Sequence, residues 1–253
     1  MKKIFILILA LLLVFFTVQI IKATYDYRKS QQVYESLQSE FVETKEIEDT
    51  DPDIFTHPVE DVETAPITID FNSLLEKNGD IVGWIYCQDT PINYPVVQAE
   101  NNDYYLRRDL NGKYLVGGTV FVDHRCATIG EDNNYILYGH NMKDGTMFNS
   151  LTKYKEQSYY DEHPVLYYLT LAADYKVELY AGIVAKRDAL IYVPNPDETE
   201  FTLFLHKAKT KSTFESNVEI NENDTIITLS TCSYEYNNAR YILIGKLIKI
   251  QTN

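Results

Sequence analysis

Two apolar segments near the end of the chain, residues 225–232 and 240–244, constrain the fold more than any other part of the sequence. Both are rich in β-branched and large apolar residues, which favour strands, and an Asn-Asn pair at 237–238 is a turn signal between them. The segments therefore predict two adjacent strands. Because side chains alternate along a strand, Ser230 and Cys232 lie on a polar face that ends in a thiol, whereas Thr231 lies on the opposite, mostly apolar face.

Cys232 and Arg240 form the first candidate site. If the two strands pair, Arg240 returns close to the thiol at one rim of the sheet. A thiolate attacks a carbonyl carbon readily, and the oxyanion that forms is stabilised by a fixed positive charge. An arginine supplies that charge at any working pH. The alternative reading is a buried structural cysteine and an arginine in a surface ion pair, because free cysteine is among the most buried residue types.

A histidine at the end of another strand is the second candidate. Residues 135–138 are apolar, Gly139 permits a turn, and His140 follows. A histidine delivered in this way can act as a general acid and base for a thiol nucleophile. His124 and Arg125 are rivals to His140 and Arg240, but we interpret them as a polar rim residue and a surface cation that follow a strand at 119–122.

Taken together, Leu-Tyr-Gly-His-Asn-Met (137–142), Thr-Leu-Ser-Thr-Cys (228–232) and Arg240 resemble the motifs of the sortases. Sortases are cysteine transpeptidases that attach surface proteins to the cell wall of Gram-positive bacteria. The resemblance covers about residues 70–250 and is strongest to class B, whose typical helical insertion matches a predicted helix at 197–209. It implies an eight-stranded β-barrel with peripheral helices.

The resemblance also implies a mechanism and its catalytic residues. Cys232 would attack the Thr carbonyl of a C-terminal sorting motif in an exported surface protein and form a thioacyl enzyme. His140 would protonate the leaving amine and then deprotonate an amine of a peptidoglycan precursor or wall peptide. Arg240 would steady the oxyanion or hold the substrate. No cofactor is implied, and no metal is expected because the Cys and His spacing does not resemble a zinc site.

The same resemblance suggests residues of a substrate groove. By position these are Asn102, Leu106, Ile191, Tyr192 and Ser230, with Thr231 as a support next to the nucleophile. Strand alternation favours Ser230 independently, since it shares a face with Cys232. Ser233 stands where some class B members have an acidic residue, so an NPQTN-like and a PxTG-like sorting motif both stay open.

The beginning of the chain predicts a membrane segment. Residues 4–21 are almost uninterruptedly apolar, and their length approaches the roughly 20 residues that span a bilayer. We favour an uncleaved anchor over a signal peptide because no small-residue cleavage site follows. Cations flank both ends, so the charges do not decide the orientation. The resemblance implies an inside N-terminus and an extracellular catalytic domain on the cell membrane, which the chain crosses once.

The expected organisation is a transmembrane segment at 1–23, an N-terminal helix and acidic linker at 24–66, and a catalytic domain at 67–253. The helix is expected at 30–42, and the linker at 43–65 is acidic and interrupted by prolines. Many short strands with few helices indicate a β-barrel or a sandwich, a mainly β fold with peripheral helices. Pro95 favours an edge position for the strand at 92–97.

Composition narrows the possible partners. The net charge of −14 argues against nucleic acid, which requires a basic surface. The chain has three cysteines, too few for a disulfide framework. Cys87 and Cys126 could pair, but we favour two buried thiols. Two other functions remain open from the residues alone: a cysteine hydrolase that uses water as the acceptor, and a non-catalytic, membrane-tethered β-domain in which Cys232 is inert.

Overall fold

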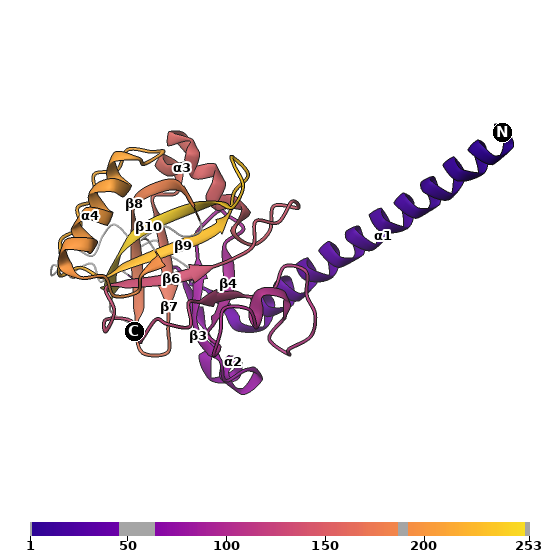
Figure 1. Ribbon diagram of the computed structural model, residues 1–253. Coiled ribbons are helices and arrows are strands. Elements are labelled where there is room, and N and C mark those ends of the chain that lie inside the picture. The colour runs from indigo at the N-terminus through magenta and orange to yellow at the C-terminus, as the bar shows by residue number, and fades with distance from the viewer. Residues whose placement is uncertain (1, 46–63, 187–191, 251–253) are drawn as a thin grey trace, which may run out of the picture.

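The centre of the fold is a closed eight-stranded β-barrel (Figure 1). The computed structural model describes residues 2–45, 64–186 and 192–250. In chain order, the elements within these ranges are α1 (Lys2–Phe41), β1 (Val42–Thr44), β2 (Ile67–Ile69), α2 (Phe71–Lys77), β3 (Ile81–Tyr86), β4 (Asn93–Val97), the 3-10 helix η1 (Tyr105–Arg107), β5 (Val120–Val122), β6 (Asn134–Tyr138), the 3-10 helix η2 (Phe148–Lys155), α3 (Gln157–Glu162), β7 (Val165–Leu169), β8 (Asp174–Lys186), α4 (Glu198–Thr210), β9 (Ile226–Cys232) and β10 (Ala239–Ile250).

The barrel strands follow the order β10-β8-β7-β3-β4-β5-β6-β9, and β9 closes on β10. The pairs β4–β5 and β6–β9 are parallel, and the other neighbours are antiparallel. This topology confirms the mainly β class and selects the barrel over the sandwich. Closure leaves no free edge in the sheet, which removes the unpaired backbone groups that an open sheet exposes.

Closure also overturns the edge position expected from Pro95. β4 lies inside the barrel, paired with β3 on one side and β5 on the other. The proline is tolerated because β5 pairs only with Val96 and Val97, so the N–H that Pro95 lacks is not needed for that ladder. The rule that proline favours edge strands failed here because the neighbouring strand, β5, is very short.

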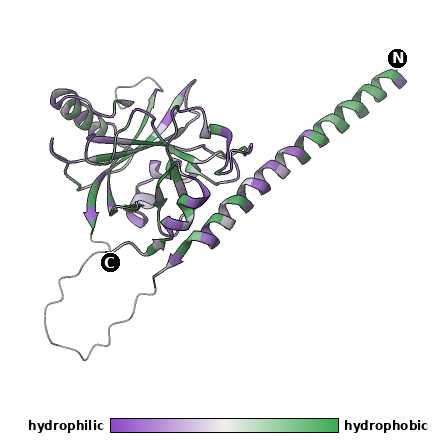
Figure 2. Ribbon diagram, turned by 90° about the horizontal axis from the view of Figure 1, so that it is seen from below, coloured by the Kyte–Doolittle hydropathy of each residue, from purple (hydrophilic) through white to green (hydrophobic). Residues whose placement is uncertain are grey.

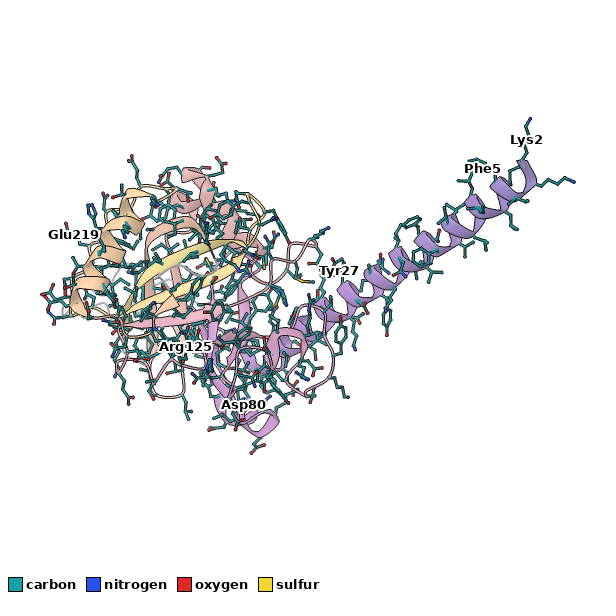
Figure 3. The ribbon with its side chains drawn as sticks, viewed as in Figure 1. Lys2, Phe5, Tyr27, Asp80, Arg125 and Glu219 are labelled. Carbon is teal, nitrogen blue, oxygen red and sulfur yellow. The ribbon has the colours of Figure 1, made fainter. Side chains whose placement is uncertain are left out.

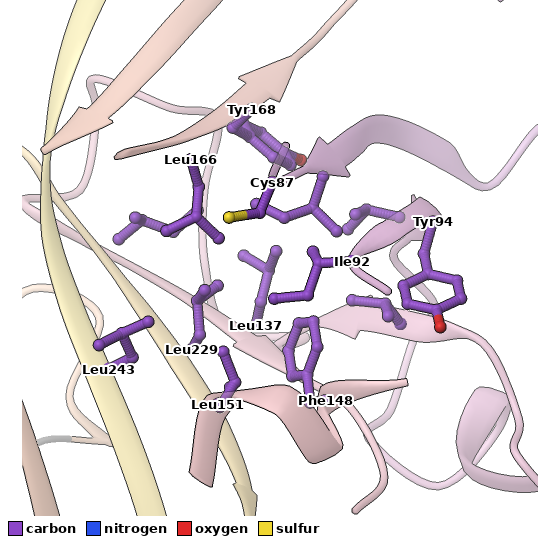
Figure 4. Close-up of a cluster of buried hydrophobic side chains, with 14 of the residues drawn as sticks. Cys87, Ile92, Tyr94, Leu137, Phe148, Leu151, Leu166, Tyr168, Leu229 and Leu243 are labelled. Carbon is purple, nitrogen blue, oxygen red and sulfur yellow. The ribbon is translucent and has the colours of Figure 1, made fainter. Parts of the chain in front are cut away.

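Alternation along the strands produces two apolar layers. The inward face of β9 contributes Ile227 and Leu229 to the barrel interior, where they meet side chains from the strands opposite and from η2 (Figure 4). The outward face of β10 contributes Ile242 and Ile244 to a second cluster that α4 covers. α4 begins at a capping box in which Asp197 accepts from the Glu200 N–H, a sequence signal for a helix start. The helix expected at 197–209 is therefore confirmed.

The N-terminal helix is longer than expected. The separate helix predicted at 30–42 is the last part of one continuous helix, α1, because residues 2–41 contain neither glycine nor proline. Its apolar N-terminal part stands away from the barrel in Figure 2, and it is long and apolar enough to cross a membrane. Its last turns pack on the barrel through Ser30, Tyr34, Leu37 and Phe41.

The segment after α1 begins differently from the expected linker. Val42–Thr44 form a short strand that pairs with Ile67–Ile69, so the chain is still attached to the folded body there. Residues 46–63 of the expected linker, with His57, lie outside the described residues. The two thiols at Cys87 and Cys126 are free and buried, as favoured from the sequence. Figure 4 shows Cys87 among the apolar side chains of the barrel interior.

Candidate active site

The hairpin formed by β9 and β10 brings Cys232 and Arg240 together. The two residues are directly opposite in the antiparallel register, so their side chains leave the sheet on the same face. Cβ atoms of such pairs are about 4.5–5.5 Å apart. Asn238 adopts a positive φ of 63° in the connecting turn, a conformation that asparagine tolerates better than most residues. The Asn-Asn turn signal therefore sets the register that joins the thiol and the guanidinium.

Parallel pairing of β6 with β9 brings the His140 segment to the same rim. Just beyond β6, the Gly139 N–H donates to the Ser230 carbonyl at 3.2 Å. The Thr231 hydroxyl donates to the Gly139 carbonyl at 2.8 Å, and the Asn141 amide donates to the Cys232 carbonyl at 2.8 Å. Hydrogen bonds on both sides of His140 thus tie it to the end of the nucleophile strand.

The His140 ring is held by a backbone carbonyl. Its Nε2 lies 2.7 Å from the Leu106 oxygen. Because a carbonyl only accepts, Nε2 carries the proton in this contact and Nδ1 is left as the acceptor of the neutral ring. Burial lowers the pKa of His140 below its ordinary value, and the charges of Arg107 and Arg240 lower it further, against the opposing effect of the Leu106 carbonyl. The neutral imidazole is therefore favoured.

These residues open onto one cavity of about 570 Å³. Eight of the nine residues expected from the sequence line it: Asn102, Leu106, His140, Tyr192, Ser230, Thr231, Cys232 and Arg240. Ile191, the ninth, lies outside the described residues. The other lining residues are Asp103, Phe121, Asp123, Arg125, Tyr138 and Gly139. Thr231 also lines the cavity, although it lies on the other face of β9 and its hydroxyl donates to the Gly139 carbonyl.

A buried carboxylate braces one wall of this cavity. The Asp123 side chain has no exposed surface, and it accepts hydrogen bonds from the Arg125 side chain at 2.8 and 2.9 Å and from the Tyr138 hydroxyl at 2.9 Å. Burial alone would raise the pKa of Asp123, but these hydrogen bonds outweigh it and lower the pKa to about 2. The carboxylate therefore stays charged and fixed.

Arg125 extends this support to two other lining residues, Tyr192 and Ser230. Its guanidinium donates to the Tyr192 carbonyl at 2.9 Å, and the Tyr192 hydroxyl is 2.9 Å from the Ser230 hydroxyl. The rings of Tyr138 and Tyr192 stack, with centroids 5.9 Å apart. Arg125 is exposed, as expected of a surface cation, but it also lines the cavity and pairs with the buried Asp123, which the sequence did not predict. Its partner Asp123 was missed, although an aspartate directly after an apolar strand was a visible signal.

His124, the rival of His140, does not line the cavity, and neither does any other described histidine apart from His140. His124 is exposed, and its backbone N–H donates to the Asn102 side chain at 2.9 Å, which fixes a lining residue instead. His163 and His206, the other two histidines among the described residues, also lie outside it. Cys87 and Cys126 are buried in the core, whereas Cys232 is partly exposed. The cavity thus combines an accessible thiol, a neutral imidazole and a permanent cation, the set required for acyl transfer through sulfur.

Comparison with known proteins identifies relatives of this arrangement. A family model described as a sortase domain matches residues 85–248. Sortase B of Listeria monocytogenes is 38% identical over 183 residues, which cover 71% of this chain and 74% of the relative. A Staphylococcus aureus sortase B–substrate complex aligns with a TM-score of 0.68 and 33% identity, over 72% of this chain and 85% of that one. A sortase B complexed with triglycine aligns with a TM-score of 0.69 and 29% identity, over 91% of this chain and 99% of that one.

Proposed function

Because this chain belongs to the sortase family and is a class B cysteine transpeptidase, we propose that it cleaves a C-terminal sorting motif after Thr and transfers the protein to a peptidoglycan amine. The observation that carries the proposal is that Cys232, His140 and Arg240 line one cavity. The three residues come from β9, from the turn after β6 and from β10.

In the first half of the reaction, the thiol proton passes to the imidazole of His140, and the Cys232 sulfur bonds to the Thr carbonyl carbon. The carbonyl oxygen becomes an oxyanion beside the Arg240 guanidinium, which lies on the same strand face as the sulfur. The amide C–N bond then breaks, and the leaving amine takes the proton from His140. The product is a thioacyl enzyme with a neutral imidazole.

In the second half, an incoming amine attacks the thioacyl carbon and gives a proton to His140. The C–S bond breaks, and the proton returns to the Cys232 sulfur. The lowered pKa of His140 favours the neutral ring that this step requires. The Nε2 contact with the Leu106 carbonyl, 2.7 Å long, holds the ring so that Nδ1 carries the exchangeable proton.

The remaining cavity residues form the proposed binding site for the sorting motif. Asn102, Leu106, Tyr192 and Ser230 line the cavity together with the catalytic residues. The Staphylococcus aureus relative forms a complex with its substrate, which supports a substrate site in this fold, and the triglycine complex of another sortase B supports an amine-bearing acceptor. Ser233, which follows the nucleophile, donates to the Glu235 side chain, and that carboxylate also pairs with Lys155.

The N-terminal part of α1 completes the proposal as a membrane anchor. Residues 4–21 are exposed and almost entirely apolar. Within the described residues, α1 is the one helix that is long and apolar enough to cross a membrane. We expect one span, with the catalytic domain outside the cell where exported proteins and wall precursors meet.

A mass measurement tests the proposed reaction. A chain that starts at residue 26 keeps the packed part of α1 and is mixed with NPQTN-like or PxTG-like peptides, with and without a glycine-peptide amine. We expect a thioacyl adduct on Cys232 that the amine converts into an amide product. Cys232→Ala should abolish the adduct, whereas Cys126→Ala, which removes a thiol buried in the core, should leave it intact.

Two outcomes would contradict the proposal. An adduct in Cys232→Ala would show that another residue is the nucleophile. An adduct that only water releases, whichever amine is offered, would favour the cysteine hydrolase.

A further inference from the structure

The membrane segment and the catalytic domain share one helix without a break. α1 runs from Lys2 to Phe41, and its first buried residue is Ser30. Residues 22–29 are therefore all that separates the apolar run from the packed part. At a rise of 1.5 Å per residue, these eight residues span about 12 Å. The headgroup layer takes up about 5–8 Å of this distance, so the nearest surface of the domain lies beside the membrane.

The loop that follows η1 contacts α1 near this point. The Lys29 ammonium lies 3.4 Å from the Tyr114 carbonyl, and the Tyr34 hydroxyl donates to the Gly118 carbonyl at 2.8 Å. Arg108 and Tyr114 pair across the base of the loop as an antiparallel bridge. These contacts hold the loop against α1 at the level where the helix leaves the domain.

The chemistry of this region differs from that of the rest of the chain. The protein as a whole carries a net charge of −14. The two segments 22–29 and 104–114 nevertheless hold six cations and two acids. The cations are Lys22, Arg28, Lys29, Arg107, Arg108 and Lys113, all of them exposed. Asp109, one of the two acids, is buried and caps backbone N–H groups of its own loop.

Exposed tyrosines accompany these cations. Tyr25 is 66% exposed, Tyr114 is 60% exposed and Tyr104 is 40% exposed. Arg108 lies over the Tyr104 ring at 4.6 Å from its centroid. Tyrosine and basic side chains together are typical of protein surfaces at the level of lipid headgroups, since the ring is amphipathic and the cation meets phosphate.

We propose that residues 22–29 and 104–114, here called the juxtamembrane face, bind anionic phospholipid headgroups of the membrane that α1 crosses. The inference rests on the proposed anchoring by residues 4–21. Cations are expected mainly on the inner side of a membrane span, so those that follow the apolar run are unusual for a domain that lies outside. Binding to headgroup phosphates would give these cations a role.

Lipid binding at the juxtamembrane face would also affect the site, because this face includes η1, which contributes Leu106 to the cavity. Leu106 lies between Tyr104 and Arg107, and its carbonyl holds the His140 ring. Contact of the juxtamembrane face with headgroups would fix Leu106 relative to the lipid surface. The cavity would then open at a defined height above the membrane.

Quenching of a fluorescent label tests the juxtamembrane face in the full-length chain. In a Cys232→Ala background, a fluorophore is attached to Tyr114→Cys, or to Glu219→Cys at the end of the molecule opposite Tyr27 (Figure 3). A third label at Tyr25→Cys reports insertion of the anchor. The proteins are reconstituted into vesicles of zwitterionic lipid, alone or mixed with an anionic phospholipid, that contain a lipid with a nitroxide on its headgroup.

We expect several-fold greater quenching at position 114 than at position 219. The difference should increase with anionic lipid and decrease at about 1 M salt, where the screening length is roughly 3 Å. Arg108→Gln with Lys113→Gln should reduce quenching at 114. The matched pair Lys207→Gln with Lys211→Gln, exposed cations at the end of the distant α4, should not.

The three labels separate the possible failures. Quenching at 25 but equally weak quenching at 114 and 219 would overturn the juxtamembrane face and leave the anchor in place. Quenching at position 114 that does not change with the lipid charge or the salt concentration would overturn the role of anionic headgroups. Absence of quenching at all three positions would overturn the membrane anchor itself, and the inference with it.

Discussion

Replacing Asp123 by Asn tests whether the buried carboxylate supports the cavity. An asparagine of nearly the same shape can still accept from Arg125 through its oxygen, but its amide turns a donor toward the guanidinium, which also only donates. The Tyr138 hydroxyl can rotate to accept from the new amide. The change therefore removes one charge-assisted hydrogen bond and the charge that pairs with Arg125.

The folding free energy lost in Asp123→Asn can be obtained in two ways, which give similar values. Loss of a hydrogen bond to a buried charged group costs about 1.5–3 kcal/mol of folding free energy. Independently, lowering the pKa of Asp123 from 3.8 to about 2, at about 1.4 kcal/mol per unit, corresponds to roughly 2 kcal/mol. For a chain of this size, that loss lowers the midpoint of thermal unfolding by about 4–8 °C.

The assay is thermal unfolding of the chain that starts at residue 26, followed between pH 7 and pH 2. A depressed carboxyl pKa stabilises the folded state above the unfolded pKa near 4, and this contribution disappears as the pH falls toward 2. The wild type should therefore exceed Asp123→Asn in stability at neutral pH, and the two should converge in acid. Glu40→Gln, which removes the partly exposed ion pair with Lys77, should cost only about 0–1 kcal/mol.

The peptide assay adds a second readout. Release of Arg125 frees the Tyr192 carbonyl, so we expect KM for a sorting-motif peptide to rise more than kcat falls. A stability difference that stays constant from pH 7 to pH 2, or that matches the Glu40→Gln control, would refute the account of Asp123.

Three further predictions concern the catalytic rim. Gly118→Ala would place a Cβ 2.5 Å from the Leu106 carbonyl oxygen, at a residue whose φ is +62°, so we expect the transpeptidation rate to fall at least about tenfold. Gly130→Ala is the control for backbone strain alone, because φ is +94° there but the space around it is open. This variant should keep its activity. The His140 ring should titrate by NMR at a pKa below the ordinary 6.5, and a midpoint at or above 6.5 would contradict the effect of burial. Arg240→Gln should lower kcat by about 10²–10³ with a smaller loss for Arg240→Lys, and equal losses would argue against a role for the positive charge.

Short-range patterns made much of the catalytic rim predictable. The alternation of β9, the turn before Arg240 and the Gly139-His140 ending of β6 each act over a few residues. Cys232 and Arg240 therefore met in the expected register. The start of α4 was predictable for the same reason. Its capping residue, Asp197, directly precedes the helix in the sequence.

The bracing of the cavity was not predictable in this way. Asp123 directly follows β5 and Tyr138 ends the neighbouring strand β6, but Tyr192 and Ser230 come from much later in the chain. Nothing local to Arg125 indicates that it will bond to the Tyr192 carbonyl. Pro95 shows the same limit. The strand that contains Pro95 was predicted correctly, but its position inside the sheet depended on how short β5 is.

The identities and the local directions of the reactive groups could be read from the chain, because strand alternation, turn type and the length of an apolar run depend on residues that are neighbours in sequence. The surroundings of these groups depend instead on the folded barrel. Barrel closure brings β6 beside β9, buries the Asp123 carboxylate, and places the Leu106 carbonyl against the His140 ring. The physical reason is that burial and charge pairing depend on contacts between segments distant in sequence, and these exist only once the barrel is closed.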